Sequence, residues 1–242
     1  MAKQRADALL VARGLCDSRE QAKRLIMAGE VMTGTERIEK PSTKLAEDAD
    51  LSVKEKPKYV GRGGFKLEGA LKEFEIDPKS WICADLGAST GGFTDCLLQH
   101  GAAKVHAIDV GTNQLVWKLR SDERVVSKER FNARSLTVED LGERVRLVVM
   151  DLSFISLTKV LSAAFGIVDE GGAVIALVKP QFELSREEVG KGGIVREPEL
   201  HQKAVEKIRT FIEDELGREW CGEMTSPITG TDGNVEFLAW MK

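Results

Sequence analysis

Short apolar runs alternate with helical patterns over the last two thirds of the chain. Runs typical of strands occupy residues 81–85, 105–110, 125–127, 147–151 and 173–179. Helical periodicity separates them near residues 92–100, 113–119, 157–168 and 199–216. Because strands that alternate with helices form right-handed βαβ units, the pattern predicts an α/β domain whose parallel sheet is covered by helices on both faces.

The end of the chain departs from this alternation. Residues 219–224 and 235–240 have strand patterns and are separated only by the turn-rich segment SPITGTDGN. Since no helix lies between them, we expect these two strands to pair antiparallel as a terminal hairpin. The predicted sheet is therefore doubly wound and mostly parallel, has seven strands and ends in an antiparallel hairpin.

The first 58 residues have the pattern of a small α+β domain. One helix is predicted over residues 5–13, and a second begins after Ser18, has an apolar stripe and ends at Gly29. Short strands are predicted at residues 31–32 and 51–53. The two predicted helices carry five basic side chains: Arg5, Arg13, Arg19, Lys23 and Arg24.

Charge adds a second distinction between the two parts. The 242 residues are 42% hydrophobic, which is enough for a sizeable core, and the net charge of −4 argues against a protein that coats nucleic acid. Residues 1–60, however, carry 12 Lys and Arg against 10 Asp and Glu, so the basic excess lies in the N-terminal part. We expect a basic, glycine-rich linker over residues 59–64, in which Arg62 helps to bind a polyanion. On charge alone, a solvated surface is an equally good interpretation.

Several classes of protein are excluded by what the sequence lacks. The four cysteines are scattered and only three histidines are present, so we expect free thiols and no metal site. The chain does not start with a signal-peptide pattern. Its longest apolar stretch, Ala173–Val178, is far shorter than the roughly 20 residues of a membrane helix. We therefore expect a cytoplasmic protein with no membrane partner.

A glycine-rich turn follows the first strand of the larger part. The segment Asp85–Phe93 reads DLGASTGGF, which lacks the lysine of a phosphate-binding P-loop and the spacing of a dinucleotide fingerprint. Asp109 ends the next predicted strand, where a carboxylate can accept hydrogen bonds from ribose hydroxyls. A nucleoside ligand without phosphate, such as S-adenosylmethionine, fits both observations. The alternative is a tight strand-to-helix turn that binds nothing.

Four polar residues form the candidate chemical site, and we refer to them as the tetrad: Lys66, Asp151, Lys179 and Glu236. Asp151 and Lys179 each follow an apolar strand, so their side chains can meet in the ligand crevice if the two strands are neighbours. A lysine balanced between desolvation and a neighbouring carboxylate can act as a general base toward a sugar hydroxyl. Taken singly, each residue is explained as well by an edge salt bridge.

The order of residues in the N-terminal part resembles a known RNA-binding domain. Arg5-Ala-Asp7, Ser18-Arg19, Gly29-Glu-Val31 and Lys40-Pro-Ser42 are similar to the small domain shared by a ribosomal protein, pseudouridine synthases and tyrosyl-tRNA synthetases. This chain has Thr33-Gly34 where that family often has Asn-Gly. The resemblance implies that residues 1–58 bind structured RNA through shape and backbone charge.

The tetrad matches, in order and strand context, the Lys-Asp-Lys-Glu set of FtsJ-type RNA 2′-O-methyltransferases. Longer strings resemble one branch, the TlyA (hemolysin A) family, over essentially the whole chain: RGGFKL at 62–67, DLGASTGGFTDCLLQHGA at 85–102, DVGTNQL at 109–115, DLSFISL at 151–157, LVKPQFE at 177–183 and GNVEF at 233–237. The resemblance implies a methyltransferase domain of Rossmann-like fold over residues 65–242, after the linker at 59–64.

This resemblance also implies an activity and a set of roles. The expected reaction is methyl transfer from S-adenosylmethionine to a ribose 2′-hydroxyl of ribosomal RNA, free or in ribosomal subunits, with no obligate protein partner. Lys179 would be the general base or would lower the pKa of the ribose hydroxyl, and Asp151 would hold the Lys179 side chain. Lys66 and Glu236 would orient the nucleotide. The implied cofactor-binding residues are Asp85, Gly87, Ser89, Gly91, Phe93, Asp109, Asn132 and Asp151. Asn132 stands where FtsJ-type enzymes often have Asp, and an amide can still pair with the adenine edge.

Three other functions remain open at this point. A non-catalytic RNA-binding or ribosome assembly factor would not need the intact tetrad. A hemolysin, as the family's older name suggests, would need a membrane-active segment that the sequence lacks. A base-methylating enzyme would need an aromatic pocket, such as an Asn-Pro-Pro-Tyr turn, where this chain has Leu152-Ser153-Phe154.

Overall fold

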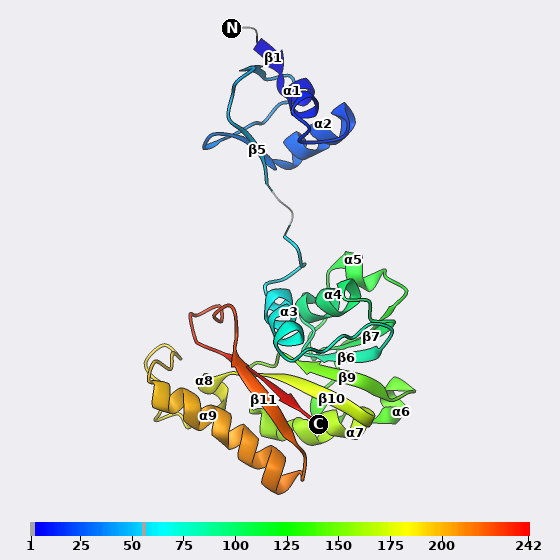
Figure 1. Ribbon diagram of the computed structural model, residues 1–242, viewed down its shortest axis with the longest axis vertical. Helices are drawn as coiled ribbons and strands as arrows, with labels where there is room; N and C mark the ends of the chain where they lie inside the picture. The colour runs from blue at the N-terminus through cyan, green and yellow to red at the C-terminus, as the bar shows by residue number, and fades with distance from the viewer. Residues whose placement is uncertain (1–2, 55–56) are drawn as a thin grey trace. The chain divides into compact units, whose positions relative to one another are not determined.

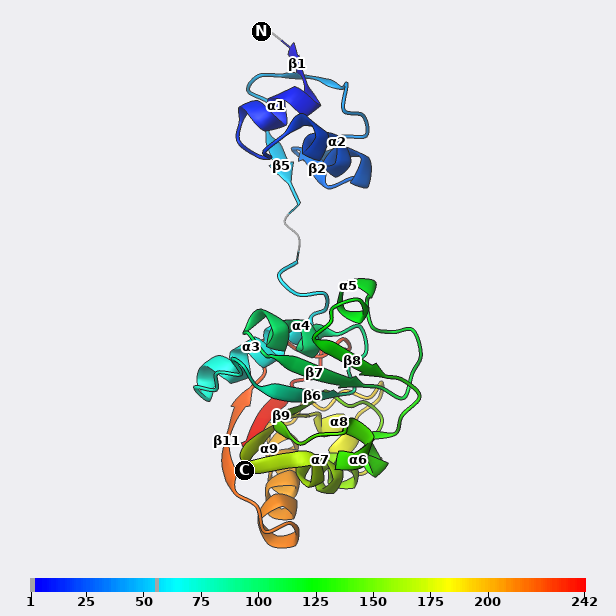
Figure 2. The same cartoon turned by 90° about the vertical axis from the view of Figure 1, so that its right-hand side faces the viewer.

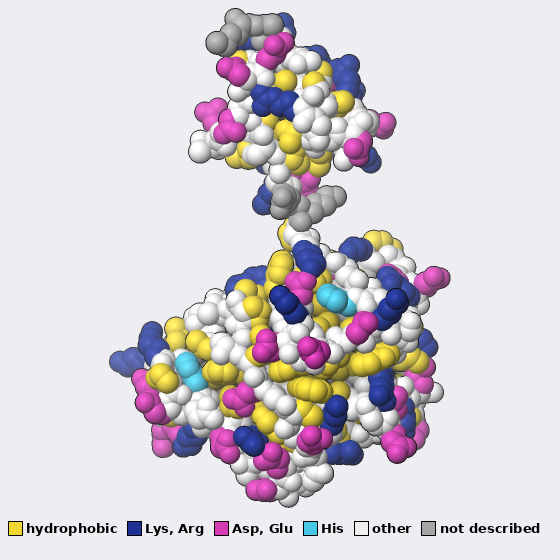
Figure 3. Space-filling view, viewed as in Figure 1, with side chains coloured by type: hydrophobic (Ala, Val, Ile, Leu, Met, Phe, Trp, Pro, Cys, Tyr) yellow, Lys and Arg dark blue, Asp and Glu magenta, His cyan; other side chains and the backbone are white. Residues whose placement is uncertain are grey.

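The computed structural model describes residues 3–54 and 57–242 of the chain. It divides into two compact units, Met1–Lys58 and Tyr59–Lys242, which we call the N-terminal unit and the catalytic unit (Figure 1). Acidic and basic side chains are interspersed on the visible face of each unit (Figure 3).

The N-terminal unit packs two helices against short strands. Its elements are β1 (Lys3–Arg5), α1 (Ala6–Ala12), α2 (Arg19–Ala28), β2 (Val31–Thr33), β3 (Glu36–Arg37), β4 (Lys44–Ala46) and β5 (Leu51–Val53). Strands β3, β2 and β5 form one sheet, and β1 pairs with β4 in another. The predicted helix signals hold, because Ser18 caps α2 by accepting from the Gln21 N–H, and Gly29 ends it at φ 73°. The apolar stripes of both helices form the core, around Leu10 and Ile26.

The catalytic unit is built on the seven-stranded sheet that the sequence predicts, with order β11-β12-β10-β9-β6-β7-β8. The strands are β6 (Ile82–Leu86), β7 (Lys104–Ile108), β8 (Val125–Lys128), β9 (Val145–Met150), β10 (Val168–Val178), β11 (Trp220–Thr225) and β12 (Phe237–Met241). From β10 to β8 all neighbours pair parallel. Strand β12 lies antiparallel between β10 and β11, which confirms the terminal hairpin.

Helices cover both faces of this sheet (Figure 2). The α-helices longer than four residues are α3 (Gly63–Glu73), α4 (Gly92–Gln99), α7 (Leu161–Ile167) and α9 (Pro198–Thr210), and α9 continues as a π-helical turn over Phe211–Glu215. The short α-helices are α5 (Trp117–Arg120), α6 (Val138–Leu141) and α8 (Pro180–Glu183). Helices α3 and α4 contribute to the core on one face, and α7 and α9 to the core on the other. Alternating strand residues supply both cores, because successive side chains of a strand point to opposite faces.

Three structural predictions need correction. The linker expected over residues 59–64 belongs to the catalytic unit, because Tyr59 is buried in its core and α3 begins at Gly63. The helix expected over residues 113–119 is limited to α5, since Asn113 has φ 54°, outside the helical region. Glu236 does not lie within the last strand but directly precedes it.

Candidate active site

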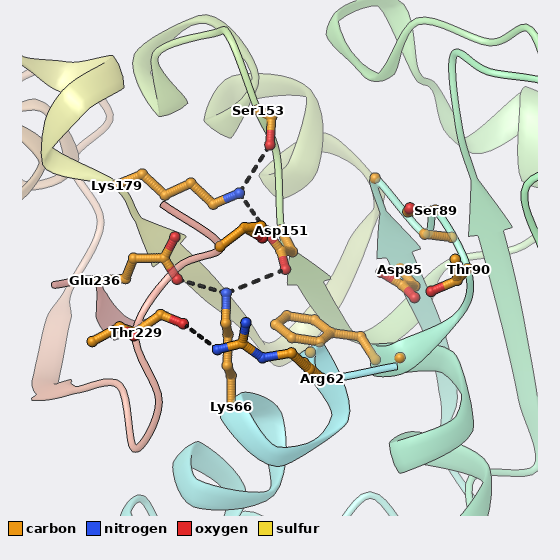
Figure 4. A pocket seen from close by; sticks show the side chains of 16 residues that line it. Arg62, Lys66, Asp85, Ser89, Thr90, Asp151, Ser153, Lys179, Thr229 and Glu236 are labelled. Carbon is orange, nitrogen blue, oxygen red and sulfur yellow. Dashed lines mark hydrogen bonds and ion pairs between the residues drawn. The ribbon is translucent and has the colours of Figure 1, made fainter. Parts of the chain in front are cut away.

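Adjacent strand ends bring the tetrad together at one edge of the sheet. Asp151 and Lys179 directly follow the parallel neighbours β9 and β10. Because β12 runs antiparallel, the residue before its first strand position reaches the same edge, and there Phe237 pairs with Val178. The fourth member, Lys66, comes from the first turn of α3. Figure 4 shows the four side chains converging on one cavity.

The tetrad forms a continuous chain of alternating charges. Lys179 Nζ lies 2.7 Å from Asp151 Oδ1, and Lys66 Nζ lies 4.0 Å from Asp151 Oδ2. Lys66 Nζ also donates to Glu236 Oε2 at 2.5 Å. Both lysines and Glu236 are buried, whereas the Asp151 side chain retains 24% exposure. Two ammonium and two carboxylate groups balance, so the site holds both lysines without an uncompensated buried charge.

Ser153 and Phe154, which follow Asp151 in the sequence, also contribute to the mouth of the site. The sequence alone assigns no role to either residue. Lys179 Nζ donates to Ser153 Oγ at 3.0 Å, so the ammonium has two fixed partners. Phe154 is 91% exposed and has φ 63°, a conformation rare for an aromatic residue. Its ring lies 5.2 Å from that of Phe182. The positive φ, uncommon for an aromatic residue, presents this apolar ring to solvent beside the site, where it is available to contact a ligand.

Arg62 lies at the N-terminal end of α3 and lines the same cavity. Its guanidinium is exposed and donates to the backbone oxygen of Thr229 at 3.0 Å, across the loop between β11 and β12 (Figure 4). This contact places a positive charge at the cavity rim. Its predicted part in binding a polyanion remains a prediction.

A second cavity adjoins that of the tetrad along the glycine-rich turn. The tetrad cavity measures about 280 Å³ and the second about 430 Å³, and both are lined by Gly87, Ser89, Asp151 and Ser153. Asp109 and Asn132 line the second cavity, and Phe93 lines the first. All of the predicted cofactor residues except Gly91 therefore line these two adjoining cavities, and Lys179 lines the tetrad cavity.

Gly87 and Gly91 have different structural reasons for being glycine. Gly87 has φ 86°, and a Cβ there would lie 2.6 Å from the backbone oxygen of Asp151. Gly91 has φ 100°, but it lines neither cavity, and a Cβ there would meet the side chains of Leu115 and Leu119. The predicted contact of Gly91 with a cofactor stays a prediction. The absence of a side chain at Gly91 leaves room for Leu115 and Leu119, and the neighbouring Gly92 lines the tetrad cavity.

Asp109 and Asn132 are expected to contact the ribose and the adenine edge of the cofactor, and each has oxygen atoms that can accept further hydrogen bonds. Asp109 accepts from the N–H of Ser89 at 2.8 Å and from that of Gly111 at 2.7 Å, which fixes the carboxylate while leaving lone pairs for further donors. The Asn132 Oδ1 accepts from the Arg134 N–H, and the residue is exposed beside the second cavity. Both side chains are pre-oriented by backbone groups rather than by other side chains.

Asp85 provides a specific test of fit for a cationic ligand. The residue is completely buried below the glycine-rich turn, and its Oδ2 accepts from Thr94 Oγ1 at 2.7 Å. Burial, with a smaller contribution from the charge of the nearby Asp151, raises the pKa of this carboxyl to about 7. Within the described part of the chain, Oδ1 has no hydrogen-bond partner although Asp85 lines the tetrad cavity. A donor such as the ammonium group of S-adenosylmethionine would satisfy this atom, so the residues present fit that cofactor.

The five basic residues expected to bind RNA fall into two groups. Arg5 and Arg19 both pair with Asp7, a residue with no exposed surface, and the Arg5 guanidinium holds the pKa of Asp7 below its usual range. Arg13 donates to the backbone oxygens of Glu47 and Ala49. By contrast, Lys23 and Arg24 on α2 are exposed and form no ion pair with the residues that the structure describes. These two are the better candidates for a direct phosphate contact.

Two further observations concern membranes and metals. Over residues 3–54 and 57–242, no helix is long and apolar enough to span a bilayer. No group of three His, Cys, Asp or Glu suited to a metal ion occurs among those same residues.

The sheet order, the glycine-rich turn after β6 and the cavity at the strand ends define the fold of S-adenosylmethionine-dependent methyltransferases. The profile of the "FtsJ-like methyltransferase" family matches residues 59–242, and that of the "S4 domain" matches residues 4–51. The chain belongs to the TlyA (hemolysin A) family of FtsJ-like methyltransferases.

Several proteins match nearly the full length of the chain. A Bacillus subtilis protein named "Putative rRNA methyltransferase YqxC" is 51% identical over 98% of this chain and 84% of its own length. The Mycobacterium tuberculosis "16S/23S rRNA (cytidine-2'-O)-methyltransferase TlyA" is 47% identical over 98% of this chain and 89% of its own. The solved structure "Putative hemolysin from Streptococcus thermophilus" is 48% identical with a TM-score of 0.74, covering 100% of this chain and 88% of that one.

Proposed function

We propose that this protein transfers a methyl group from S-adenosylmethionine to a ribose 2′-hydroxyl of ribosomal RNA. The observation that carries the proposal is the position of the buried Lys179 ammonium. It lies 2.7 Å from Asp151 and lines the tetrad cavity, beside the second cavity, in which the cofactor residues Asp109 and Asn132 lie. S-adenosylmethionine supplies an electrophilic methyl group when bound. The protein must then position a hydroxyl in line with that group and remove its proton.

Each tetrad member has a separate task in this proposal. Lys179 reacts as the neutral amine, after its ammonium has released a proton to solvent. Its lone pair takes the proton of the hydroxyl as the oxygen–carbon bond forms and the sulfur–carbon bond breaks, which leaves the lysine ammonium and S-adenosylhomocysteine. Asp151 and Ser153 hold Lys179 Nζ by two contacts, which fixes the direction of its remaining valence. Lys66 and Glu236, joined to each other and to Asp151, orient the ribose by ammonium and carboxylate contacts.

The cofactor would lie along the depression that the glycine-rich turn forms. Asp109 would accept from its ribose hydroxyls, Asn132 would contact the adenine edge, and the unpartnered Asp85 Oδ1 would accept from its amino group. Gly87 and Ser89 would line its middle, since both border the two cavities. This placement brings the methyl group to the end of the depression where Lys179 stands.

Ribosomal RNA is proposed as the substrate for two independent reasons. Relatives of 51% and 47% identity carry rRNA methyltransferase names. The N-terminal unit matches the S4 domain and has basic α2 residues free to contact phosphates, namely Lys23 and Arg24. The exposed ring of Phe154 beside Lys179 offers a stacking surface for a base drawn out of the RNA.

The test is methyl transfer to defined RNA substrates. The protein is incubated with labelled S-adenosylmethionine and separately with each ribosomal subunit, intact ribosomes and naked rRNA. Blocked alkaline cleavage then locates any 2′-O-methyl group. Transfer to a single ribose position supports the proposal. A folded protein that binds the cofactor yet methylates none of these substrates would favour the non-catalytic assembly factor, and lysis of erythrocytes without RNA methylation would favour a hemolysin.

A further inference from the structure

A third cavity opens on the far side of the tetrad from the glycine-rich turn. It measures about 470 Å³ and shares Ser153, Lys179 and Glu236 with the tetrad cavity, but none of its lining residues belongs to the turn. The aromatic pair formed by Phe154 and Phe182 lies on its wall. A volume in this range suits a small ligand, so on the proposed function this cavity faces the nucleotide that receives the methyl group.

Gln181 lines this cavity with an unsatisfied polar atom. It stands two residues after Lys179, in the short helix α8. Its Oε1 is buried and has no hydrogen-bond partner among the residues that the structure describes. A buried acceptor without a donor costs folding free energy, so such an atom calls for a partner that arrives with a ligand.

Resting on the proposed function, we propose that Gln181 Oε1 accepts a hydrogen bond from the exocyclic amino group of the acceptor base. Gln181 would thereby limit methylation to nucleotides whose base carries an amine at this edge. The base would stack on the exposed ring of Phe154, its ribose would face Lys179, and its amino edge would point to α8. Gln181 would be a specificity-determining residue and would take no part in the chemical step.

The discrimination follows from the donor and acceptor pattern of the bases. Cytosine presents an N4 amine beside the N3 acceptor, whereas uracil presents the O4 acceptor at the same place. Gln181 Oε1 is shielded from water although the residue lines the cavity, so a turn of the side chain presents to the amine an acceptor that needs little further desolvation. The O4 oxygen of uracil is itself an acceptor, so it would leave Gln181 Oε1 without a hydrogen bond and would place two acceptors opposite each other. A site built to hydrogen-bond a group rejects the analogue that lacks it more strongly than an apolar pocket does.

The experiment compares two acceptor bases and three side chains. The methylated nucleotide is first mapped with the wild-type protein, and rRNA is then prepared with that base exchanged between cytosine and uracil. The kcat/KM for methyl transfer is measured on both RNAs with the wild type, Gln181→Glu and Gln181→Met. Glutamate keeps an acceptor and loses the amide donor, and methionine keeps the length of the side chain but offers no comparable acceptor. The Kd for S-adenosylmethionine is the control for local folding.

The expected results separate specificity from structural support. The wild type prefers the amino base by about tenfold or more, Gln181→Glu keeps that preference, and Gln181→Met lowers the rate on the amino base until the two rates are similar. The Kd for S-adenosylmethionine stays within a factor of about 2 of the wild-type value.

Three results would overturn the inference while leaving the proposed function intact. They are a natural acceptor that is uridine, whose base has no exocyclic amine, equal wild-type rates on both bases, or an unchanged base preference in Gln181→Met. A wild-type protein that methylates no rRNA would instead overturn the proposed function, and this inference with it.

Discussion

The ammonium of Lys66 lies 2.5 Å from a carboxylate oxygen of Glu236, although 170 residues separate them in the sequence. Lys66 belongs to the first turn of α3, and Glu236 directly precedes β12, so the contact joins the first helix of the catalytic unit to its last strand. Both side chains are buried. The pair therefore fixes the tetrad geometry and at the same time makes the fold depend on a buried pair of charges.

Removing one member of this pair should cost more stability than removing both. Glu236→Leu leaves the Lys66 ammonium buried with only Asp151 at 4.0 Å, which costs about 3–5 kcal/mol and lowers the melting temperature by about 10 °C. The double variant Lys66→Met/Glu236→Leu should recover most of that loss without recovering methyl transfer. Calorimetry and a transfer assay on the same preparations measure both.

An exposed pair is the matched control for this cycle. Arg209 and Glu213 pair at 3.3 Å with side chains 45% and 41% exposed, away from the residues that line the tetrad cavity. The double variant Arg209→Met/Glu213→Leu should change stability by less than about 1 kcal/mol and leave transfer unchanged. A double variant of the tetrad pair that is no more stable than Glu236→Leu would contradict our account of the pair.

Gly87→Ala should weaken cofactor binding without unfolding the protein. A Cβ at this position would lie 2.6 Å from the backbone oxygen of Asp151, so the turn must move away from both cavities. We expect the Kd for S-adenosylmethionine to rise by about tenfold or more. Gly142→Ala is the control, because Gly142 has a similar φ of 79° and nothing within 4 Å of its Cβ position. Both variants share the backbone cost of about 1–2 kcal/mol, and calorimetric titration would show whether only Gly87→Ala loses the cofactor.

Asp85 should make the cofactor-free protein less stable as the pH rises. Burial raises the pKa of this carboxyl to about 7 in the folded state, above its value in the unfolded chain. Between about pH 4 and pH 7 the folded state holds a proton that the unfolded state has released, so stability falls with rising pH and levels off above pH 7. Across this range, the wild type should lose up to about 4 kcal/mol relative to Asp85→Asn.

Melting temperatures of both proteins from pH 4 to pH 8 test this prediction. Asparagine can still accept from Thr94, so the variant removes the titration and keeps that hydrogen bond. The comparison also cancels the contribution of Glu183, whose pKa is likewise raised by burial. Parallel curves for the two proteins would show that Asp85 does not titrate in this range.

The two groups of basic residues in the N-terminal unit should behave differently. Lys23→Ala/Arg24→Ala should weaken rRNA binding and reduce the slope of log K against log salt by about 2, because each lost phosphate contact removes about 0.9 from that slope on a duplex. Arg19→Ala should instead lower stability, since it removes a partner from the buried Asp7. Filter binding over a salt series, with calorimetry, separates the two effects. An unchanged salt slope in the double variant would place the RNA contact elsewhere.

The sequence predicts most of the fold because local periodicity encodes strands and helices. Alternating apolar runs predict the seven strands of a mostly parallel sheet. Strand-end positions predict that Asp151 and Lys179 can meet if their strands are neighbours, and β9 and β10 do pair as parallel neighbours. The terminal hairpin follows from the absence of a helix between its strands, and this prediction is also confirmed. Both inferences depend only on the direction in which each strand runs and on which strands are neighbours in the sheet.

What the sequence does not predict depends on contacts between distant elements. The pairing of Arg5 and Arg19 with Asp7 requires α1 and α2 to be packed, so a pattern cannot distinguish these arginines from the exposed Lys23. Tyr59 lies in a basic, glycine-rich segment that is typical of a linker, yet it is buried by the catalytic unit. Phe154 belongs to a string that resembles the family, but only its φ of 63° and its exposure indicate a contact surface.

The central claim is that Lys179 activates a ribose hydroxyl for methyl transfer. It is tested most directly by mass spectrometry of the nucleosides released from rRNA that has been treated with S-adenosylmethionine and either the wild type or Lys179→Met. Our account predicts a ribose-methylated nucleoside with the wild type, a rate lower by at least about 100-fold with Lys179→Met, and similar cofactor affinity for both proteins. A base-methylated product, or full ribose methylation by Lys179→Met, would contradict it.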